Sequence, residues 1–171
     1  MTHIEHERKY LVDPERFTTY LEGLSPDQYV RKTVQQWYIT DTVSGFTGRL
    51  RYVYVPSTTL RQPPTYFLTF KKPTDDMAKR VELESTISKE MFEGMLQHFD
   101  LQSFVSKTRI YFTSSQHPVE EIVDIFPNGL MLYEIENPPK NFVPPSWCTD
   151  DVTNDKAYIS QNLGCPSRQF E

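Results

Sequence analysis

The sequence has few of the residues that mark secreted or membrane-bound proteins. It contains only two cysteines, Cys148 and Cys165, among 171 residues. Two cysteines cannot form a disulfide framework, and their scarcity favours a reducing compartment, which we expect to be the cytoplasm. No apolar run approaches the length of a membrane span, and the polar, charged start does not resemble a signal peptide. We therefore expect no membrane association.

An excess of basic residues is also missing. The 18 Lys and Arg face 23 Asp and Glu, which gives a net charge of −5 and argues against DNA as a partner. The four histidines lack zinc-ligand spacing, and no Ser-His-Asp or Cys-His arrangement indicates a covalent nucleophile. The length predicts a single domain over residues 1–171, and 13 prolines with ten tyrosines favour strands with irregular connections.

The first ten residues contain the most informative stretch. If this stretch is a strand, Glu5, Glu7 and Lys9 lie on one face because side chains alternate. Carboxylates about 7 Å apart on one strand face repel each other unless a cation lies between them. Hard divalent metals such as Mg²⁺ or Mn²⁺ prefer oxygen ligands of this kind. Taken alone, however, the segment also fits a solvated edge strand with mixed charges.

The same alternation returns along the chain. Apolar side chains occupy one face of each later segment, and charged side chains occupy the other. We predict strands near residues 33–40, 48–55, 65–71, 79–84, 103–112, 122–126 and 130–137, and helices at 14–24, 88–100 and from about 153 to 164. The charged faces carry seven cations, Lys9, Arg49, Arg51, Lys71, Arg80, Lys107 and Arg109, and seven carboxylates, Glu5, Glu7, Glu82, Glu84, Asp124, Glu134 and Glu136.

This charged face has two interpretations. It is either the wet side of an open antiparallel sheet or the inner surface of a closed barrel. The dominance of Arg and of carboxylates repeated at i and i+2 favours the barrel. Charges inside a barrel must be paired or bound to a ligand and a metal. Arg forks suit phosphate oxygens and carboxylates suit the metal, so the pattern favours a condensed phosphate chain with its metal ion.

The residues also resemble a known family. Glu5-His6-Glu7-Arg8-Lys9 matches the E-x-E-x-K signature of the CYTH superfamily, the triphosphate tunnel metalloenzymes, and the chain is most similar to its short bacterial, tripolyphosphatase-like members. The similarity continues in order through Arg49-Leu50-Arg51, Thr69-Phe70-Lys71, Arg80-Val81-Glu82-Leu83-Glu84, Lys107-Thr108-Arg109, Asp124 and Glu134-Ile135-Glu136. The resemblance implies an α+β fold, in which an eight-stranded antiparallel closed β-barrel carries helices on its outside and a short C-terminal closing helix. Asp155-Lys156-Ala157-Tyr158 resembles that closing helix, although Ala157 and Ser160 replace residues that are common there.

The resemblance also assigns roles. It implies metal ligation of Mg²⁺ or Mn²⁺ by Glu5, Glu7, Asp124, Glu134 and Glu136. It implies phosphate binding by Lys9, Arg49, Arg51, Lys71, Arg80, Lys107, Arg109 and Lys156. It implies catalytic roles for Glu82, Glu84, Lys107 and Tyr38, with Glu82 or Glu84 orienting water.

Three functions fit this set of residues. The first is metal-dependent hydrolysis of inorganic tripolyphosphate or a related triphosphate such as thiamine triphosphate. The second is a class IV adenylate cyclase, in which the ribose 3′-OH of ATP replaces water. The third is a polyphosphate or nucleotide sensor without turnover. A homodimer is left open by the sequence.

Overall fold

A computed structural model gives the fold of the chain. The structure describes residues 3–40, 47–56, 62–74, 79–113 and 120–166. At residues 3–5, 40, 73, 79, 80 and 166 it describes the backbone alone.

Eight antiparallel strands form a closed ring. The pairings run β6-β2-β3-β4-β5-β1-β8-β7, and pairing of β7 with β6 closes the barrel. The strands are β1 (His3–Val12), β2 (Tyr29–Thr40), β3 (Thr47–Tyr54), β4 (Thr65–Pro73), β5 (Lys79–Ile87), β6 (Leu101–Phe112), β7 (Glu121–Ile125) and β8 (Met131–Glu136). The predicted α+β fold with a closed eight-stranded barrel is therefore confirmed. β2 and β6 begin a few residues before the predicted limits.

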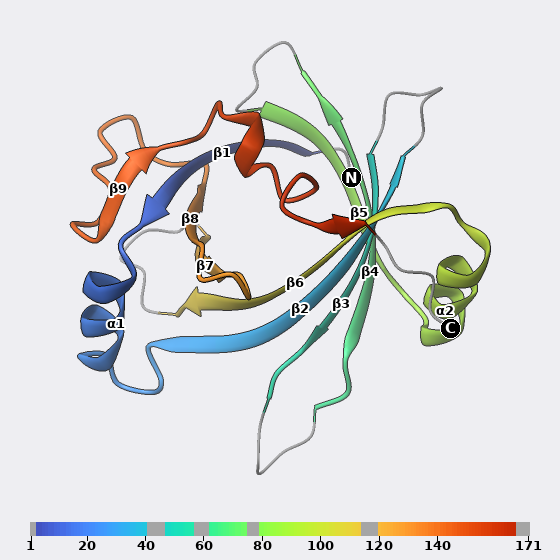
Figure 1. Ribbon diagram of the computed structural model, residues 1–171, viewed down its shortest axis with the longest axis horizontal. Helices are drawn as coiled ribbons and strands as arrows, with labels where there is room; N and C mark the ends of the chain where they lie inside the picture. Colours follow the sequence, from blue (N-terminus) through green and yellow to red (C-terminus); the bar gives the residue numbers. More distant parts are fainter. Residues whose placement is uncertain (1–2, 41–46, 57–61, 75–78, 114–119, 167–171) are drawn as a thin grey trace.

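The two helices lie outside the ring, on opposite sides of the molecule (Figure 1). α1 (Pro14–Glu22) begins at Asp13, whose carboxylate accepts hydrogen bonds from two backbone N–H groups, and α2 (Lys89–His98) is capped by Ser88. Phe17 of α1 packs on an apolar cluster with Trp147, and Phe92 of α2 packs on Trp37. The apolar faces of the strands therefore point outward under the helices, and no described helix is long and apolar enough to cross a membrane.

One end of the barrel interior is filled with apolar side chains. Val105, Phe126 and Leu132 share strand faces with Lys107, Asp124 and Glu134, so they point inward as well. They pack with Tyr38 and with residues of the C-terminal segment into one buried cluster, whose other members are Leu11, Leu130, Val152, Tyr158 and Leu163. We call this cluster the apolar plug.

The C-terminal segment crosses the barrel in short pieces. The predicted helix from about 153 to 164 is reduced to one 3₁₀ turn, Lys156–Tyr158, between β9 (Cys148–Asp151) and β10 (Cys165–Pro166). β9 pairs with β1, and β10 pairs with β6. Gly164 lies so close to β6 that an added Cβ would come within 2.9 Å of the Phe104 carbonyl oxygen. Strand pairing therefore fixes the segment at both ends, and this tertiary context overrides the predicted helix.

The two cysteines differ in exposure, which gives a first testable prediction. Cys148 is partly buried and Cys165 is exposed, and burial raises the pKa of the Cys148 thiol to about 12. Because only the thiolate reacts, we expect Cys148 to be alkylated about a hundredfold or more slowly than Cys165 at pH 8. Mass spectrometry of iodoacetamide-treated native protein measures both rates, and unfolded protein provides the control. Equal native rates would contradict this placement of Cys148.

Candidate active site

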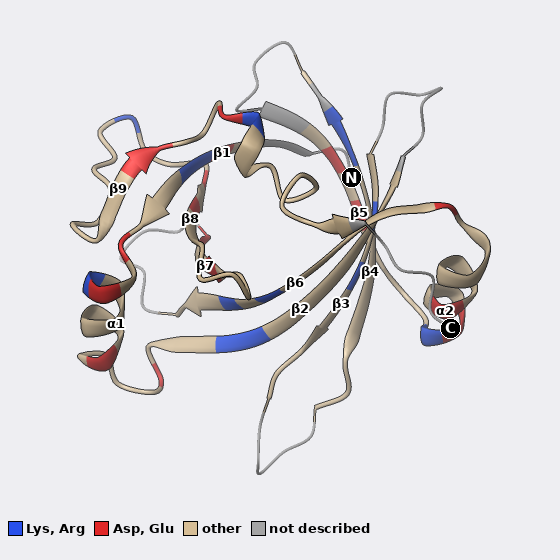
Figure 2. Ribbon diagram, viewed as in Figure 1, with Lys and Arg blue, Asp and Glu red and all other residues tan. Residues whose placement is uncertain are grey.

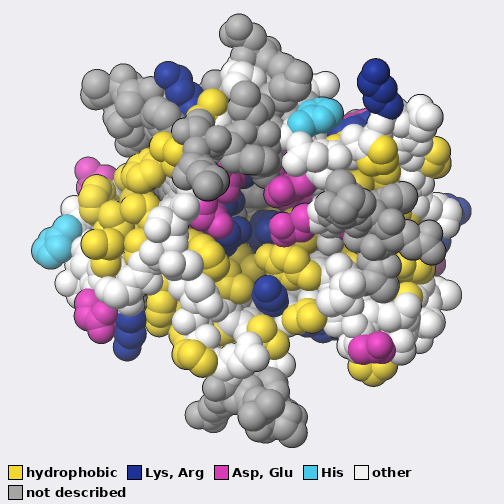
Figure 3. All heavy atoms as spheres, turned by 180° about the vertical axis from the view of Figure 1, so that it is seen from behind, with side chains coloured by type: hydrophobic (Ala, Val, Ile, Leu, Met, Phe, Trp, Pro, Cys, Tyr) yellow, Lys and Arg dark blue, Asp and Glu magenta, His cyan; other side chains and the backbone are white. Residues whose placement is uncertain are grey.

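The barrel encloses a cavity of about 780 Å³ lined mostly by charged side chains. Figure 2 shows that charged residues lie along the strands as well as on the helices, and in Figure 3 acidic and basic side chains surround a hollow at the middle of the face. Strands β1, β6, β7 and β8 form one wall, with Glu7, Lys9, Arg109, Tyr111, Ile122, Glu134 and Glu136, and Glu120 joins it just before β7. Strands β3, β4 and β5 form the other, with Thr47, Arg49, Arg51, Phe67, Lys71, Glu82 and Glu84. Tyr38 of β2 and Lys156, Ile159, Ser160 and Gln161 of the C-terminal segment complete the lining.

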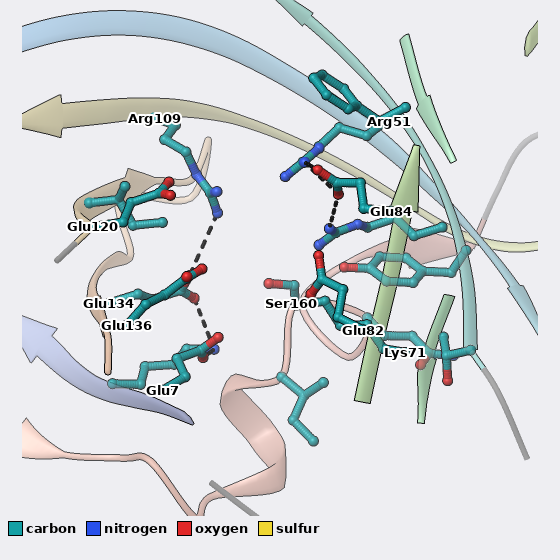
Figure 4. A pocket seen from close by; sticks show the side chains of 18 of the residues that line it. Glu7, Arg51, Lys71, Glu82, Glu84, Arg109, Glu120, Glu134, Glu136 and Ser160 are labelled. Atoms are coloured by element: carbon teal, nitrogen blue, oxygen red, sulfur yellow. Dashed lines mark hydrogen bonds and ion pairs between the residues drawn. The ribbon is translucent and has the colours of Figure 1, made fainter. Parts of the chain in front are cut away.

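The first wall, which we call the acidic wall, concentrates carboxylates. Glu7 stands directly opposite Glu136 in the β1–β8 register, and Lys9 stands opposite Glu134. Figure 4 shows Glu7, Glu134 and Glu136 together on one side of the cavity. Like charges directly opposite each other destabilise a strand pair, so the Glu7–Glu136 position favours a bound cation.

Lys9 is embedded in this wall. Its ammonium lies 3.1 Å from Glu7 and 2.9 Å from Glu134, and it donates to the Tyr158 carbonyl at 3.3 Å. Burial alone would lower the pKa of Lys9, but the carboxylates of Glu134 and Glu7 outweigh burial and raise it. Lys9 is therefore a permanent cation that ties the acidic wall to the C-terminal segment.

Behind the acidic wall lies a buried ionic triad. Asp124 is completely buried and accepts hydrogen bonds from Arg109 at 2.7 and 2.8 Å and from Lys107 at 2.5 Å. Arg109 also reaches Glu134 at 3.6 Å and lines the cavity, whereas Lys107 and Asp124 are not among the lining residues. Burial lowers the pKa of Lys107 to about 8, although Asp124 opposes this shift. Asp124 therefore holds Arg109 in place at the cavity surface.

The second wall, which we call the basic wall, carries two adjacent guanidinium groups. Arg49 and Arg51 both contact Glu84, at 3.4 and 2.8 Å, and Thr69 donates to the same carboxylate at 2.7 Å. Burial, reinforced by the charge of Arg49, lowers the pKa of Arg51 to about 10. The Nε atoms of both arginines are buried and lack a hydrogen-bond partner among the described residues. Two cations thus share one carboxylate and keep unused donors.

Lys71 and Glu82 extend the basic wall along β4 and β5. Their side chains form an ion pair of 2.5 Å, and the two residues stand opposite each other in the strand register. Both of the carboxylates predicted to orient water, Glu82 and Glu84, are therefore already held by cations of their own wall.

The structure brings most of the predicted residues to one cavity, while their roles remain predictions. Lys9, Tyr38, Arg49, Arg51, Lys71, Arg109 and Lys156 line it together with Glu7, Glu82, Glu84, Glu134 and Glu136. The side chains of Glu5 and Arg80 lie outside the described part of the structure, although their backbones pair in β1 and β5. Further residues line the cavity that the sequence did not predict: Thr47, Phe67, Tyr111, Glu120, Ile122, Ile159, Ser160 and Gln161. Phe67 was detectable, because it shares a strand face with Thr69 and Lys71.

The buried carboxylates predict sensitivity to acid. Burial would raise the pKa of Asp124 and of Glu134, but for Asp124 the charges of Arg109 and Lys107, and for Glu134 those of Lys9 and Lys107, outweigh it and lower both values. Since both pKa values are lower in the folded than in the unfolded chain, these groups add stability above about pH 4 that is lost as the pH falls. We expect the thermal midpoint to drop steeply between pH 5 and pH 2.5, as measured by circular dichroism. A midpoint that stays constant over this range would contradict the prediction.

The fold is similar to those of several solved structures. The inorganic triphosphatase NE1496 has 24% identity and a TM-score of 0.55 over 95% of this chain and 97% of that one. PH1819 from Pyrococcus horikoshii OT3 has 22% identity and a TM-score of 0.58 over 83% and 80% of the two chains. A candidate adenylate cyclase from Vibrio parahaemolyticus has 17% identity and a TM-score of 0.55 over 82% and 79%. No protein-family model and no curated protein matches the sequence.

Proposed function

We propose that this chain, which has the fold of the CYTH superfamily of triphosphate tunnel metalloenzymes, hydrolyses inorganic tripolyphosphate or a related organic triphosphate with a divalent metal ion. The proposal draws on the fold shared with the inorganic triphosphatase NE1496 and on the two charged walls of the cavity.

The observation that carries the proposal is the uncompensated charge of the basic wall. Arg49 and Arg51 are nearly buried, with side chains 13% and 12% exposed, and both contact the same carboxylate, that of Glu84. One carboxylate cannot neutralise two guanidinium groups, so the excess positive charge calls for an anion in the cavity that both arginines line. Phosphate oxygens meet this need, since a guanidinium donates to them in pairs with favourable geometry.

The acidic wall suits a divalent cation by its chemistry. Glu7, Glu134 and Glu136 offer carboxylate oxygens, which Mg²⁺ and Mn²⁺ prefer. Among the described residues, no three Asp, Glu, His or Cys side chains lie close enough together to hold a metal ion on their own. A bound Mg²⁺ or Mn²⁺ would neutralise phosphate charge and lower the pKa of a bound water. Glu7 and Glu136 are the residues that we assign to hold it.

The residues of the chain divide the remaining tasks between the walls. Arg49, Arg51 and Lys71 bind the phosphate oxygens from one side, and Arg109, fixed by Asp124, faces them from the other. Glu84 keeps Arg51 in place and, once phosphate replaces it as a partner, is free to accept a hydrogen bond from water. Positioning and charge stabilisation supply most of the catalysis in phosphoryl transfer.

Replacing Arg51 tests the proposal. Phosphate release from tripolyphosphate, thiamine triphosphate and ATP is measured with Mg²⁺ and with Mn²⁺. We expect R51Q to lower kcat/KM for the preferred substrate by about 100-fold, because a charged donor to the transition state is lost. R31Q is the matched control. Arg31 is exposed, lies against the ring of Tyr29 near the start of β2, and does not line the cavity. Equal activity of R51Q and R31Q, or no phosphate release from any of the three substrates, would overturn the proposal.

A class IV adenylate cyclase is the second candidate, and the aromatic residues of the cavity favour it. Phe67 and Tyr111 line the cavity, and the Arg51 guanidinium lies 4.8 Å from the Phe67 ring centre. A bare phosphate chain gains nothing from such surfaces, whereas a purine base stacks on them. Cyclic AMP and pyrophosphate formed from ATP in the same assay would select this candidate.

A further inference from the structure

Two inward-facing residues of β2 are hydrogen-bonded to each other inside the barrel. The Gln36 amide Nε2 donates to the Tyr38 hydroxyl at 2.6 Å. Gln36 is 1% exposed and Tyr38 is 6% exposed, so little water competes for this bond. In the β2–β3 register the pair stands directly opposite Arg51 and Arg49. The two uncharged side chains therefore lie beside the guanidinium pair of the basic wall.

Tyr38 lines the cavity together with Lys9, Arg49 and Lys71, which come from both walls. Burial raises the pKa of Tyr38, and the charges of Arg49, Lys71 and Lys9 partly offset that effect. A hydrogen bond from Ser160 of the C-terminal segment acts in the same direction, as a donor to the phenol oxygen does. A phosphate chain held by Arg49 and Lys71 would therefore pass within reach of this hydroxyl.

The bond from Gln36 decides where the Tyr38 hydrogen can point. A phenol oxygen has one hydrogen and accepts hydrogen bonds through its lone pairs, and an amide nitrogen can only donate. Because the Gln36 N–H takes up a lone pair, the Tyr38 hydrogen must be directed elsewhere. In this orientation the Gln36 Oε1 is buried without a hydrogen-bond partner among the described residues, whereas an amide turned the other way would accept the Tyr38 hydrogen and leave none for a phosphate.

We propose that Gln36 is a positioning residue that holds Tyr38 as a hydrogen-bond donor to the phosphate chain. This inference rests on the proposed function, since the acceptor is a phosphate oxygen. It assigns Tyr38 a donating role in the cavity and gives Gln36 a task that its burial alone does not explain.

A double-mutant cycle tests the coupling. We expect Q36M and Y38F each to lower kcat/KM for tripolyphosphate about tenfold, because each removes a hydrogen bond to the bound phosphate chain. The double variant should be no slower than Y38F alone, because Gln36 acts through Tyr38. Q35M is the matched control, since Gln35 is the neighbouring glutamine on the outward face of β2 and should leave kcat/KM unchanged. A full kcat/KM in Q36M, or a further tenfold loss when Q36M is added to Y38F, would overturn the inference.

A measurement without turnover keeps the inference testable if Q36M does not fold or if tripolyphosphate is not a substrate. In protein labelled with ¹³C at the tyrosine ζ carbon, Y38F identifies the Tyr38 signal. We expect tripolyphosphate without metal to shift that signal in the wild type, because the Tyr38 hydroxyl then donates its hydrogen to a phosphate oxygen. A shift without hydrolysis would reject the proposed function and support the donor role, whereas an unmoved signal would reject the donor role.

Discussion

Glu136→Gln is expected to abolish most hydrolysis while leaving the fold intact. Glu136 stands opposite Glu7 on the acidic wall, and an amide there keeps the shape but removes the charge that a divalent cation needs. We expect kcat to fall by about 100-fold or more, the usual cost of losing one preorganised charge at the transition state. Phosphate release at saturating Mg²⁺ measures the effect, and Mn²⁺ binding followed by electron paramagnetic resonance should weaken in parallel.

Glu93→Gln is the control for this experiment. Glu93 lies on the exposed side of α2 and pairs only with Lys89 among the described residues, at 3.5 Å. The substitution is chemically identical but lies outside the cavity, so it should leave both readouts unchanged. Near wild-type turnover in E136Q would exclude the acidic wall as the metal site.

Asp124→Asn is expected to have the largest effect on stability. The change leaves Lys107 and Arg109 buried with one fewer negative charge, and breaking a buried ion pair in this way costs about 3–5 kcal/mol. Urea unfolding at pH 7, followed by circular dichroism, measures the loss. If the variant is folded at low temperature, its affinity for tripolyphosphate should also fall, because the Asn amide group replaces one of the two oxygens that accept hydrogen bonds from Arg109 and hold it at the cavity.

Asp151→Asn is the matched control for stability. Asp151 also pairs with an arginine, Arg8 at 2.6 Å, but its side chain is 41% exposed. Exposed pairs contribute no more than about 1 kcal/mol, so D151N should be nearly neutral. Equal losses of unfolding free energy in D124N and D151N would mean that burial does not determine how much the Asp124 triad contributes to stability.

Alternation along the strands made much of the site predictable. Glu5-x-Glu7-x-Lys9, Arg49-x-Arg51 and Glu134-x-Glu136 each place charges on one face, and the residues of these pairs whose side chains are described line the cavity. The same rule explains the position of the helices. The outward-facing apolar side chains of the strands must be covered, and Phe17 of α1 and Phe92 of α2 cover them.

A two-residue period gives the face of a side chain but not its depth along the barrel. Asp124, Lys107 and Phe126 share inward faces with residues that line the cavity, yet Phe126 belongs to the apolar plug and Asp124 and Lys107 to the buried triad. Depth depends on strand register, which no local pattern reveals. Ser160 was unpredictable for a related reason, because the route of the C-terminal segment depends on its pairing with β1 and β6.

The apolar plug has a consequence for substrates longer than a triphosphate. Phe126 and Leu132 pack inside the barrel against residues of the C-terminal segment, so we expect that a polymer cannot be threaded through it. A long polyphosphate would have to enter by its terminus and leave by the same opening. Any cleavage of such a chain would therefore shorten it stepwise from the end, and internal cuts that yield mid-sized fragments are not expected.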